Sequence, residues 1–140
     1  MGRILAIDYG TKRTGIAVTD PLRIIPGGLA TVATHELPSF LAGYFSKEQV
    51  DQIVVGYPTN MNGEESASMK QIRPFVEKLK KQYPDKQVVM FDERFTSVLA
   101  QKAILEAGIK KMARRNKALV DEVSATIILE SYMNSIHYKQ

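Results

Sequence analysis

Acidic residues stand at three places where the sequence pattern predicts apolar elements. Asp8 ends the first apolar run, Asp92 and Glu93 end a later one, and Asp121 lies inside the last amphipathic stretch. Carboxylates belong on protein surfaces, so each of these positions needs a reason. If the three regions meet in the fold, their carboxylates repel one another and one takes up a proton unless a cation compensates the charge. Mg²⁺ or Mn²⁺ is the natural compensator for such a cluster of oxygen ligands.

The last acidic position is the most informative, because helical spacing predicts its direction. Asp121 shares a helix face with residues that suit a buried surface, and we expect that face to lie against the sheet. These residues are Ala125, Ile128 and Tyr132. The neighbouring Glu122 shares its face with Thr126 and Glu130, a pattern typical of a solvent-exposed face. Asp121 is therefore the better candidate for a ligand.

The choice between Asp92 and Glu93 stays open at this point. The strand expected from Gln87 to Phe91 is apolar on both of its faces, so the alternation of its side chains does not tell which acid points toward the other two.

Carboxylates that hold two divalent cations about 3.5–4 Å apart can promote the attack of water on a phosphodiester bond. The excess of basic residues fits a phosphate-rich partner, since 19 Lys and Arg outnumber 15 Asp and Glu and the net charge is +4. The candidate contacts to a nucleic-acid backbone follow the expected acids or form a basic run. They are Lys12, Arg13, Arg94, Lys110, Lys111, Arg114 and Arg115.

Each of these residues also has a purely structural interpretation. Asp8 followed by Gly10 is typical of a turn, Asp121 is compatible with a place near the start of a helix, and Glu93 can pair with Arg94. A basic run such as 110–117 is often only a solvated connection. The joint order of the motifs, rather than any one of them, favours a site.

Composition excludes several classes of site. The chain has 140 residues, which predicts one domain over 1–140, and it has no cysteine, which excludes disulfides, thiolate nucleophiles and cysteine-based zinc sites. No secretory signal and no apolar run of membrane-spanning length is visible. We therefore expect a cytoplasmic protein without a membrane partner.

The predicted elements give a mixed sheet. Strands are expected at 4–7, 16–18, 29–32, 50–55 and 87–91, and helices around 37–44, over 64–82, from Thr96 or Ser97 to Gly108, and over 116–135. Pro74 predicts a kink or a new helical start near Arg73. Three leading antiparallel strands followed by alternating helices and parallel strands predict an α/β fold with a five-stranded mixed sheet and helices on both faces.

Four segments then become recognisable together: IDYGTKRTGIAV, VVGYPTNMNG, FDERFTS and VDEVSATIILESY. In order and spacing they resemble the YqgF family, also called the RuvX-like family, over nearly the whole chain. The resemblance implies a ribonuclease H-like fold with an acid on the first strand, one on the fourth and one on the last helix. It implies Asp8, Glu93 and Asp121 as catalytic residues and metal ligands, and so favours Glu93 over Asp92.

The resemblance also implies a function. Members of the family are associated with processing the 5′ end of precursor 16S ribosomal RNA, and were earlier linked to Holliday junctions by analogy with RuvC. The leading expectation is thus a hydrolase, a metal-dependent endonuclease of ribosome biogenesis that uses Mg²⁺ or Mn²⁺, with two ions expected.

Three other hypotheses remain. Cleavage of branched DNA in recombination or repair would require a homodimer with two sites rather than a monomer, and the sequence leaves the oligomeric state open. A nucleic-acid-binding factor without catalysis is a second. The segment IDYGTKRTG is also similar to the phosphate-binding hairpin of actin-like ATPases, but no second such hairpin is visible, so no nucleotide cofactor is expected.

Overall fold

A five-stranded sheet forms the centre of the computed structural model, which describes residues 2–58, 68–93 and 117–138. Its strands are β1 (Arg3–Asp8), β2 (Arg13–Thr19), β3 (Pro26–Ala33), β4 (Val50–Tyr57) and β5 (Gln87–Asp92). Around it lie a short 3₁₀ turn (Thr34–Glu36) and the helices α1 (Leu37–Lys47), α2 (Met69–Gln82) and α5 (Lys117–Tyr138).

The strand order β3-β2-β1-β4-β5 makes the sheet mixed. β2 pairs antiparallel with both β1 and β3, whereas β4 pairs parallel with both β1 and β5. The parallel strands β1, β4 and β5 therefore end at the same edge of the sheet. The predicted α/β fold with three antiparallel strands followed by parallel ones is confirmed.

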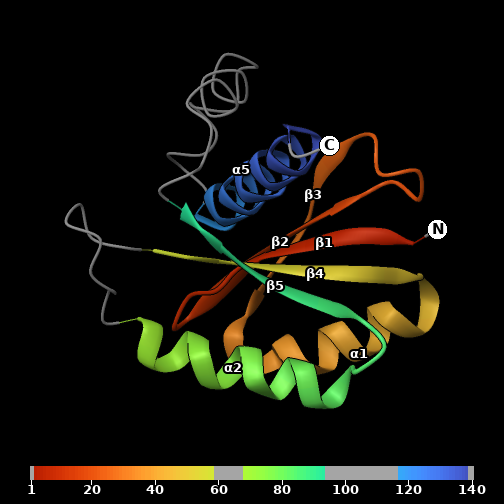
Figure 1. The fold of residues 1–140 in the computed structure, drawn as a ribbon. Coiled ribbons are helices and arrows are strands. Elements are labelled where there is room, and N and C mark those ends of the chain that lie inside the picture. The colour runs from red at the N-terminus through yellow and green to blue at the C-terminus, as the bar shows by residue number, and fades with distance from the viewer. Residues whose placement is uncertain (1, 59–67, 94–116, 139–140) are drawn as a thin grey trace.

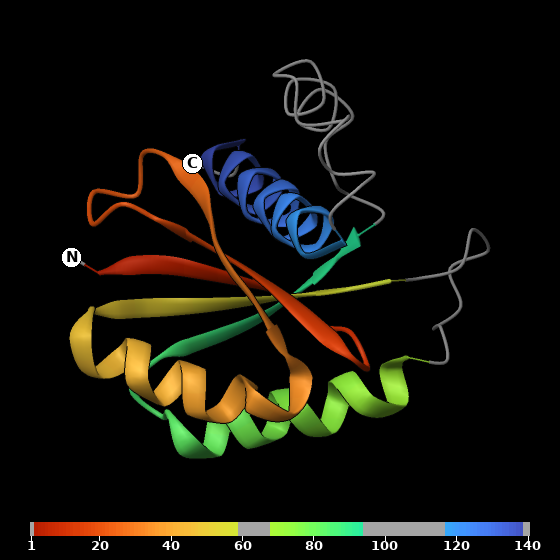
Figure 2. The ribbon, with the colours of Figure 1, turned by 180° about the vertical axis from the view of Figure 1, so that it is seen from behind.

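Alternating side chains divide the core into two layers. On β1, Leu5 and Ile7 pack in the cluster that contains α1 and α2, while Ile4 and Ala6 pack in the cluster that contains α5. Figures 1 and 2 show the same arrangement, with α1 and α2 below the sheet and α5 above it. Helices thus cover both faces, as predicted.

Pro74 does not start a new helix. α2 runs from Met69 to Gln82 with Pro74 inside it, so the alternative of a new start near Arg73 is wrong, while the alternative of a kink stays a prediction. The proline removes one backbone donor, while residues before and after it are buried against the sheet and hold the two parts together. These residues are Met69, Ile72, Val76 and Leu79.

Other boundaries differ from the prediction by a few residues. β3 and β4 are longer than expected because their glycines pair within the sheet: Gly28 lies opposite Ala17 and Gly56 opposite Asp8. Three predicted segments lie outside the described residues: the beginning of the helix over 64–82, the helix between Thr96 and Gly108, and residues 110–116 of the basic run. The last residue of that run, Lys117, begins α5.

None of the helices in the described ranges has the length and apolarity that a membrane crossing requires.

Candidate active site

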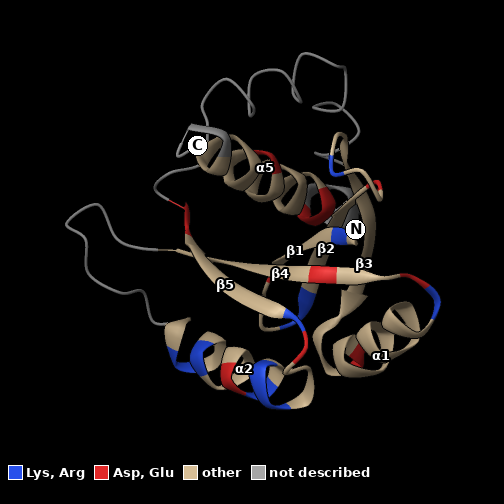
Figure 3. Cartoon of the chain, turned by 45° about the vertical axis from the view of Figure 1, so that its right-hand side comes forward, with Lys and Arg blue, Asp and Glu red and all other residues tan. Residues whose placement is uncertain are grey.

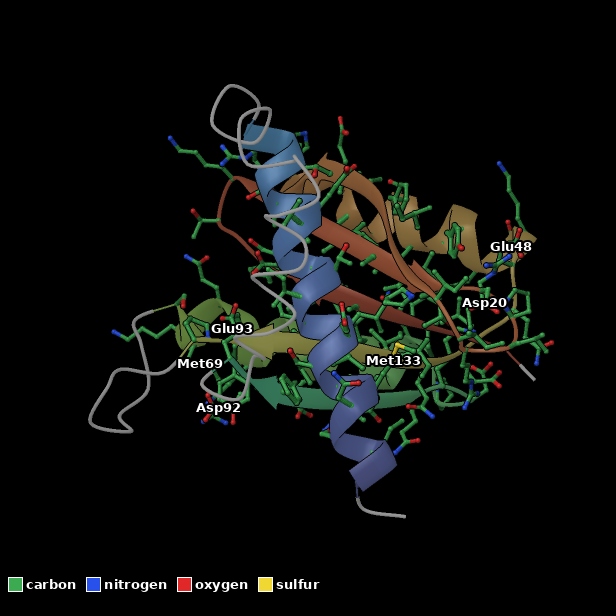
Figure 4. The ribbon with its side chains drawn as sticks, turned by 90° about the horizontal axis from the view of Figure 1, so that it is seen from above. Asp20, Glu48, Met69, Asp92, Glu93 and Met133 are labelled. Carbon is green, nitrogen blue, oxygen red and sulfur yellow. The ribbon has the colours of Figure 1, made fainter. Side chains whose placement is uncertain are left out.

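The end of β1 lies beside the ends of its parallel neighbours. Asp8, the last residue of β1, pairs with Gly56 of β4, and Tyr57 in turn pairs with Asp92 at the end of β5. The acids at the ends of β1 and β5 are therefore brought to one edge of the sheet, separated by a single strand. The second acid thus stands at the end of the fifth strand in chain order, not of the fourth as the resemblance implied. Figure 4 labels Asp92 and Glu93 at the arrowhead of β5, with Asp20 and Glu48 toward the opposite end.

The two adjacent acids at this end of the sheet differ in position, because Asp92 is the last residue of β5 and Glu93 follows it. Val89 and Phe91 pack in the α5 cluster, whereas Val88 and Met90 pack against the α1 and α2 side. Asp92, which is only 6% exposed, follows Met90 in this alternation. Glu93 comes directly after β5, in a 3₁₀ turn, and its charge acts on Asp8, which lies on the α5 face of the sheet.

The third acid reaches this edge because of a glycine. Gly15 on β2 pairs with Asp8, and a Cβ atom added to Gly15 would lie 2.0 Å from the carbonyl oxygen of Asp121. Any side chain at position 15 would push the start of α5 off the sheet. The glycine thus lets α5 carry Asp121 to the strand residue next to Asp8.

A second glycine acts on the other side of Asp8. A Cβ added to Gly56 would lie 2.5 Å from the Cδ1 atom of Ile128, which is buried on α5. Asp8 is therefore flanked on both neighbouring strands by glycines over which α5 packs closely. Sequence reasoning missed both positions, because it placed the two glycines just outside the strands expected at 16–18 and 50–55, whereas a glycine inside a strand would have signalled a close approach.

The expected face of α5 is found against the sheet. Ala125, Ile128 and Tyr132 are all buried in the α5 cluster, as predicted for the neighbours of Asp121. Glu122, however, does not lie on a fully solvated face. A Cβ atom added to Gly28 would lie only 3.3 Å from the Cβ atom of Glu122. The expectation for Glu122 is wrong to that extent, since its face of the helix partly covers β3.

The surroundings of the acids at this edge of the sheet disfavour their negatively charged forms. Burial raises the pKa of Asp8 to about 7, with further contributions from the charges of Glu93 and Asp121. Burial also raises the pKa of Glu93, and the neighbouring charge of Asp92 adds to it. The carboxylates are thus close enough to repel one another in a partly desolvated place.

Arg13 lies against the third acid. Its guanidinium Nε donates a hydrogen bond of 2.5 Å to Oδ2 of Asp121. The tip of the β1–β2 hairpin is held in place by Thr34, whose hydroxyl donates to the carbonyl of Gly10 at 2.6 Å and whose amide donates to the carbonyl of Lys12 at 2.9 Å. Lys12 itself is exposed.

The chemistry of the acids fits a hard divalent cation, since carboxylate oxygens are its preferred ligands and its charge would relieve their repulsion. Across the described ranges, no three acidic or histidine side chains already lie close enough to share one ion. The ion pair with Arg13 holds the carboxylate of Asp121. The role of Asp8, Glu93 and Asp121 as ligands stays a prediction.

The other basic residues predicted to contact a nucleic-acid backbone are Arg94, Lys110, Lys111, Arg114 and Arg115, and all of them lie outside the described residues. Sequence reasoning missed a further basic surface on α2, visible as blue segments in Figure 3. Its exposed members are Lys70, Arg73, Lys78, Lys80 and Lys81. Figures 1 and 2 show that α2 begins at the edge where β5 ends.

Comparison with known proteins agrees with the resemblance. The model of the RuvX family, described as Holliday junction resolvase, matches residues 2–135. A relative from Porphyromonas gingivalis is 64% identical over 96% of this chain and 98% of its own length, and one from Bacteroides thetaiotaomicron is 60% identical over the same shares. Both carry the name "Putative pre-16S rRNA nuclease".

The fold also has a solved counterpart. The Holliday junction resolvase of fowlpox virus superposes with a TM-score of 0.57 over 96% of this chain and 99% of that one, at 12% sequence identity, a likeness of fold alone. The expected class of enzyme, a hydrolase of nucleic acid, is confirmed at the level of the family, although the family description and the names of the relatives point to different nucleic acids. From the match of the family model over residues 2–135 and the identity to these relatives, the chain belongs to the RuvX family.

Proposed function

We propose that the chain is a metal-dependent endonuclease that cleaves precursor 16S ribosomal RNA near its 5′ end, acting in the cytoplasm as a single domain over 1–140. The observation that carries the proposal is the gathering of Asp8, Glu93 and Asp121 at one edge of the sheet, where burial and mutual repulsion raise the pKa of Asp8 to about 7. Such perturbed groups are typical of functional sites.

The residues of the chain would divide the work as follows. Asp8, Glu93 and Asp121 would hold the cation, and Asp8 would give up its proton to let it bind. Mg²⁺ or Mn²⁺, with two ions expected, would supply an activated water there and would stabilise the leaving oxygen of the phosphodiester. Lys12 and Arg13, at the tip of the hairpin that follows Asp8, bind the phosphate backbone and orient it.

The ribosomal substrate is favoured by the names of the relatives, which are 60–64% identical to this chain. The second candidate is cleavage of branched DNA, favoured by the description of the family model. It requires two sites related by the symmetry of a homodimer. A strict monomer in light scattering at the concentration of the assay would therefore count against the second candidate.

The experiment uses a labelled fragment of precursor 16S ribosomal RNA and a four-way DNA junction, each with Mg²⁺ or Mn²⁺. The wild type is compared with Asp8→Asn and with Asp85→Asn, whose side chain is 77% exposed in the turn before β5. We expect RNA cleavage by the wild type and by Asp85→Asn, and none by Asp8→Asn.

Two other outcomes have clear meanings. Cleavage of the junction alone would establish the second candidate in place of the first. Binding of RNA without cleavage, unchanged in Asp8→Asn and steeply weakened by salt, would identify a binding factor without catalysis.

A further inference from the structure

The guanidinium of Arg13 lies where a cation is expected. It makes a charge-assisted hydrogen bond with Asp121, a residue 108 positions away in the sequence, at the edge where the three carboxylates gather. We propose that Arg13 takes the place of a divalent cation at Asp121 in the metal-free protein, and that it moves to the substrate phosphodiester when the cation binds. The inference rests on the proposed function, because it assumes that Asp121 is a metal ligand.

The charge of the site gives the first reason. Asp8 and Glu93 are partly desolvated and lie within electrostatic reach of each other, and the charge of Asp121 also reaches Asp8. A third negative group at this edge adds repulsion unless a positive group accompanies it. Arg13 supplies that positive group from the hairpin that begins directly after Asp8.

The geometry gives the second reason. While Arg13 holds Asp121, no three acidic side chains of the described ranges are close enough to share an ion. The backbone around Asp121 is fixed against Gly15, so the helix has no room to move closer to β2. On this proposal the carboxylate of Asp121 turns away from Arg13 as the ligands assemble, while the backbone stays in place.

The exchange is feasible because the ion pair is accessible to water. The side chain of Arg13 is 43% exposed and that of Asp121 is 20% exposed. Such pairs are weak in solution, whereas a divalent cation would bind several carboxylates at once. Thr34 holds the backbone of the hairpin tip, so the guanidinium alone has to swing. Its planar donors then suit the oxygens of a phosphodiester.

The first test is a calorimetric titration of Mn²⁺ into the full chain without nucleic acid. Arg13→Gln removes the competing cation, so its dissociation constant for Mn²⁺ should be lower than that of the wild type by about two- to fivefold, the range that an exposed ion pair provides. Lys12→Gln is the matched control. It removes the same charge from the same hairpin tip, but Lys12 forms no ion pair with another described residue, so its effect should be smaller.

The same variant should bind the RNA substrate more weakly, although it binds Mn²⁺ more tightly. At saturating Mn²⁺, Arg13→Gln should have a higher KM for the RNA than the wild type, because a phosphate contact is lost while the metal site is intact. An Arg13 that only stabilised the fold would not tighten metal binding while weakening substrate binding.

The second test uses the wild type and does not depend on how a variant folds. The Nε–H signal of Arg13 in a nitrogen–proton correlation spectrum, assigned by its loss in Arg13→Gln, should shift when Mg²⁺ saturates the protein. An unchanged signal under saturation would show that Arg13 stays on Asp121 and would overturn the inference while leaving the proposed function standing. A wild type that binds neither Mg²⁺ nor Mn²⁺ would overturn both.

Discussion

Asp8 is the residue on which the electrostatics of the site depend. Its pKa of about 7, raised by burial and by two neighbouring carboxylates, means that the folded protein without a cation keeps this group protonated at pH values well above its ordinary pKa of 3.8. Because the folded state then binds more protons than the unfolded one, this group lowers the stability as the pH rises from about 4 to about 7. In the proposed function, a bound cation offsets this loss of stability.

Asp8→Asn should therefore stabilise the metal-free protein. We expect its free energy of unfolding to exceed that of the wild type by at least about 1 kcal/mol at about pH 8, and the difference to shrink at about pH 5, since one pKa unit corresponds to about 1.4 kcal/mol. The measurement is urea unfolding with a chelator present. Equal stabilities at the higher pH would contradict the raised pKa.

The adjacent acids Asp92 and Glu93 offer a matched pair of substitutions. Glu93→Gln should weaken Mn²⁺ binding by at least about 100-fold, because loss of a ligand costs more than loss of a group that merely orients one. Asp92→Asn removes the same charge from the face of β5 opposite to that of Asp8 and should leave most of the affinity. Calorimetric titration of both variants checks this, and a larger loss in Asp92→Asn would reverse the assignment.

The sequence alone could not decide between these two acids. Their strand is apolar on both faces, and which face meets which helix depends on how α2 and α5 pack, which is a tertiary property. The position of Asp121, in contrast, could be predicted, because a helix with one buried face fixes the direction of each of its residues. The ion pair with Arg13 joins segments distant in sequence and left no local signal.

At the scale of elements, the contact of α5 with β2 places the third acid. A Cβ at position 15 would lie 2.0 Å from a backbone oxygen of Asp121, a distance that no rotation of a side chain can relieve. The start of α5 would have to shift, and with it the carboxylate that the site needs.

Gly15→Ala should therefore impair both folding and the site. We expect a loss of stability of about 1–3 kcal/mol, the usual range for an overpacked core, together with weaker Mn²⁺ binding. Gly43→Ala is the control: Gly43 lies inside α1 and a Cβ there meets nothing within 4 Å. That substitution should stabilise the protein by about 0.5–1 kcal/mol and leave metal binding unchanged. Thermal unfolding and calorimetry measure the two effects, and equal behaviour of the variants would refute the argument.

Most elements could be predicted from their patterns, and the errors have physical causes. Hydrophobic periodicity indicated all five strands and the last helix, because each buries a continuous face. The effect of Pro74 was overestimated, since packing of α2 on the sheet outweighs one lost hydrogen bond. β3 was predicted too short because its glycines weaken the pattern, although they pair with β2 and make room for Glu122.

At the scale of the whole molecule, charge should govern how the protein meets nucleic acid. The net charge is +4, and exposed basic residues lie on α2 and at the hairpin tip beside the acids. Each phosphate contact releases about one counterion, so it contributes about one unit to the slope of log affinity against log salt.

Lys12→Gln should thus reduce that slope by about one unit for precursor RNA. Lys47→Gln is the control, because Lys47 is exposed at the end of α1, just before β4 begins, at the edge away from the acids. Binding is measured over a series of salt concentrations with Ca²⁺ in place of Mg²⁺. A smaller slope in the Lys47 variant than in the Lys12 variant would show that the contact surface lies elsewhere.

The close packing of α5 over Gly15 has a consequence for the time at which the enzyme becomes active. Asp8 leaves the ribosome early in synthesis, whereas Asp121 lies on α5, which follows every strand of the sheet. A nascent chain translated only as far as β5 thus carries the basic hairpin without the acid that completes the site. If the chain is the RNA endonuclease proposed above, its activity begins only after α5 has emerged and docked, and an unfinished chain does not cut RNA beside the ribosome that is making it.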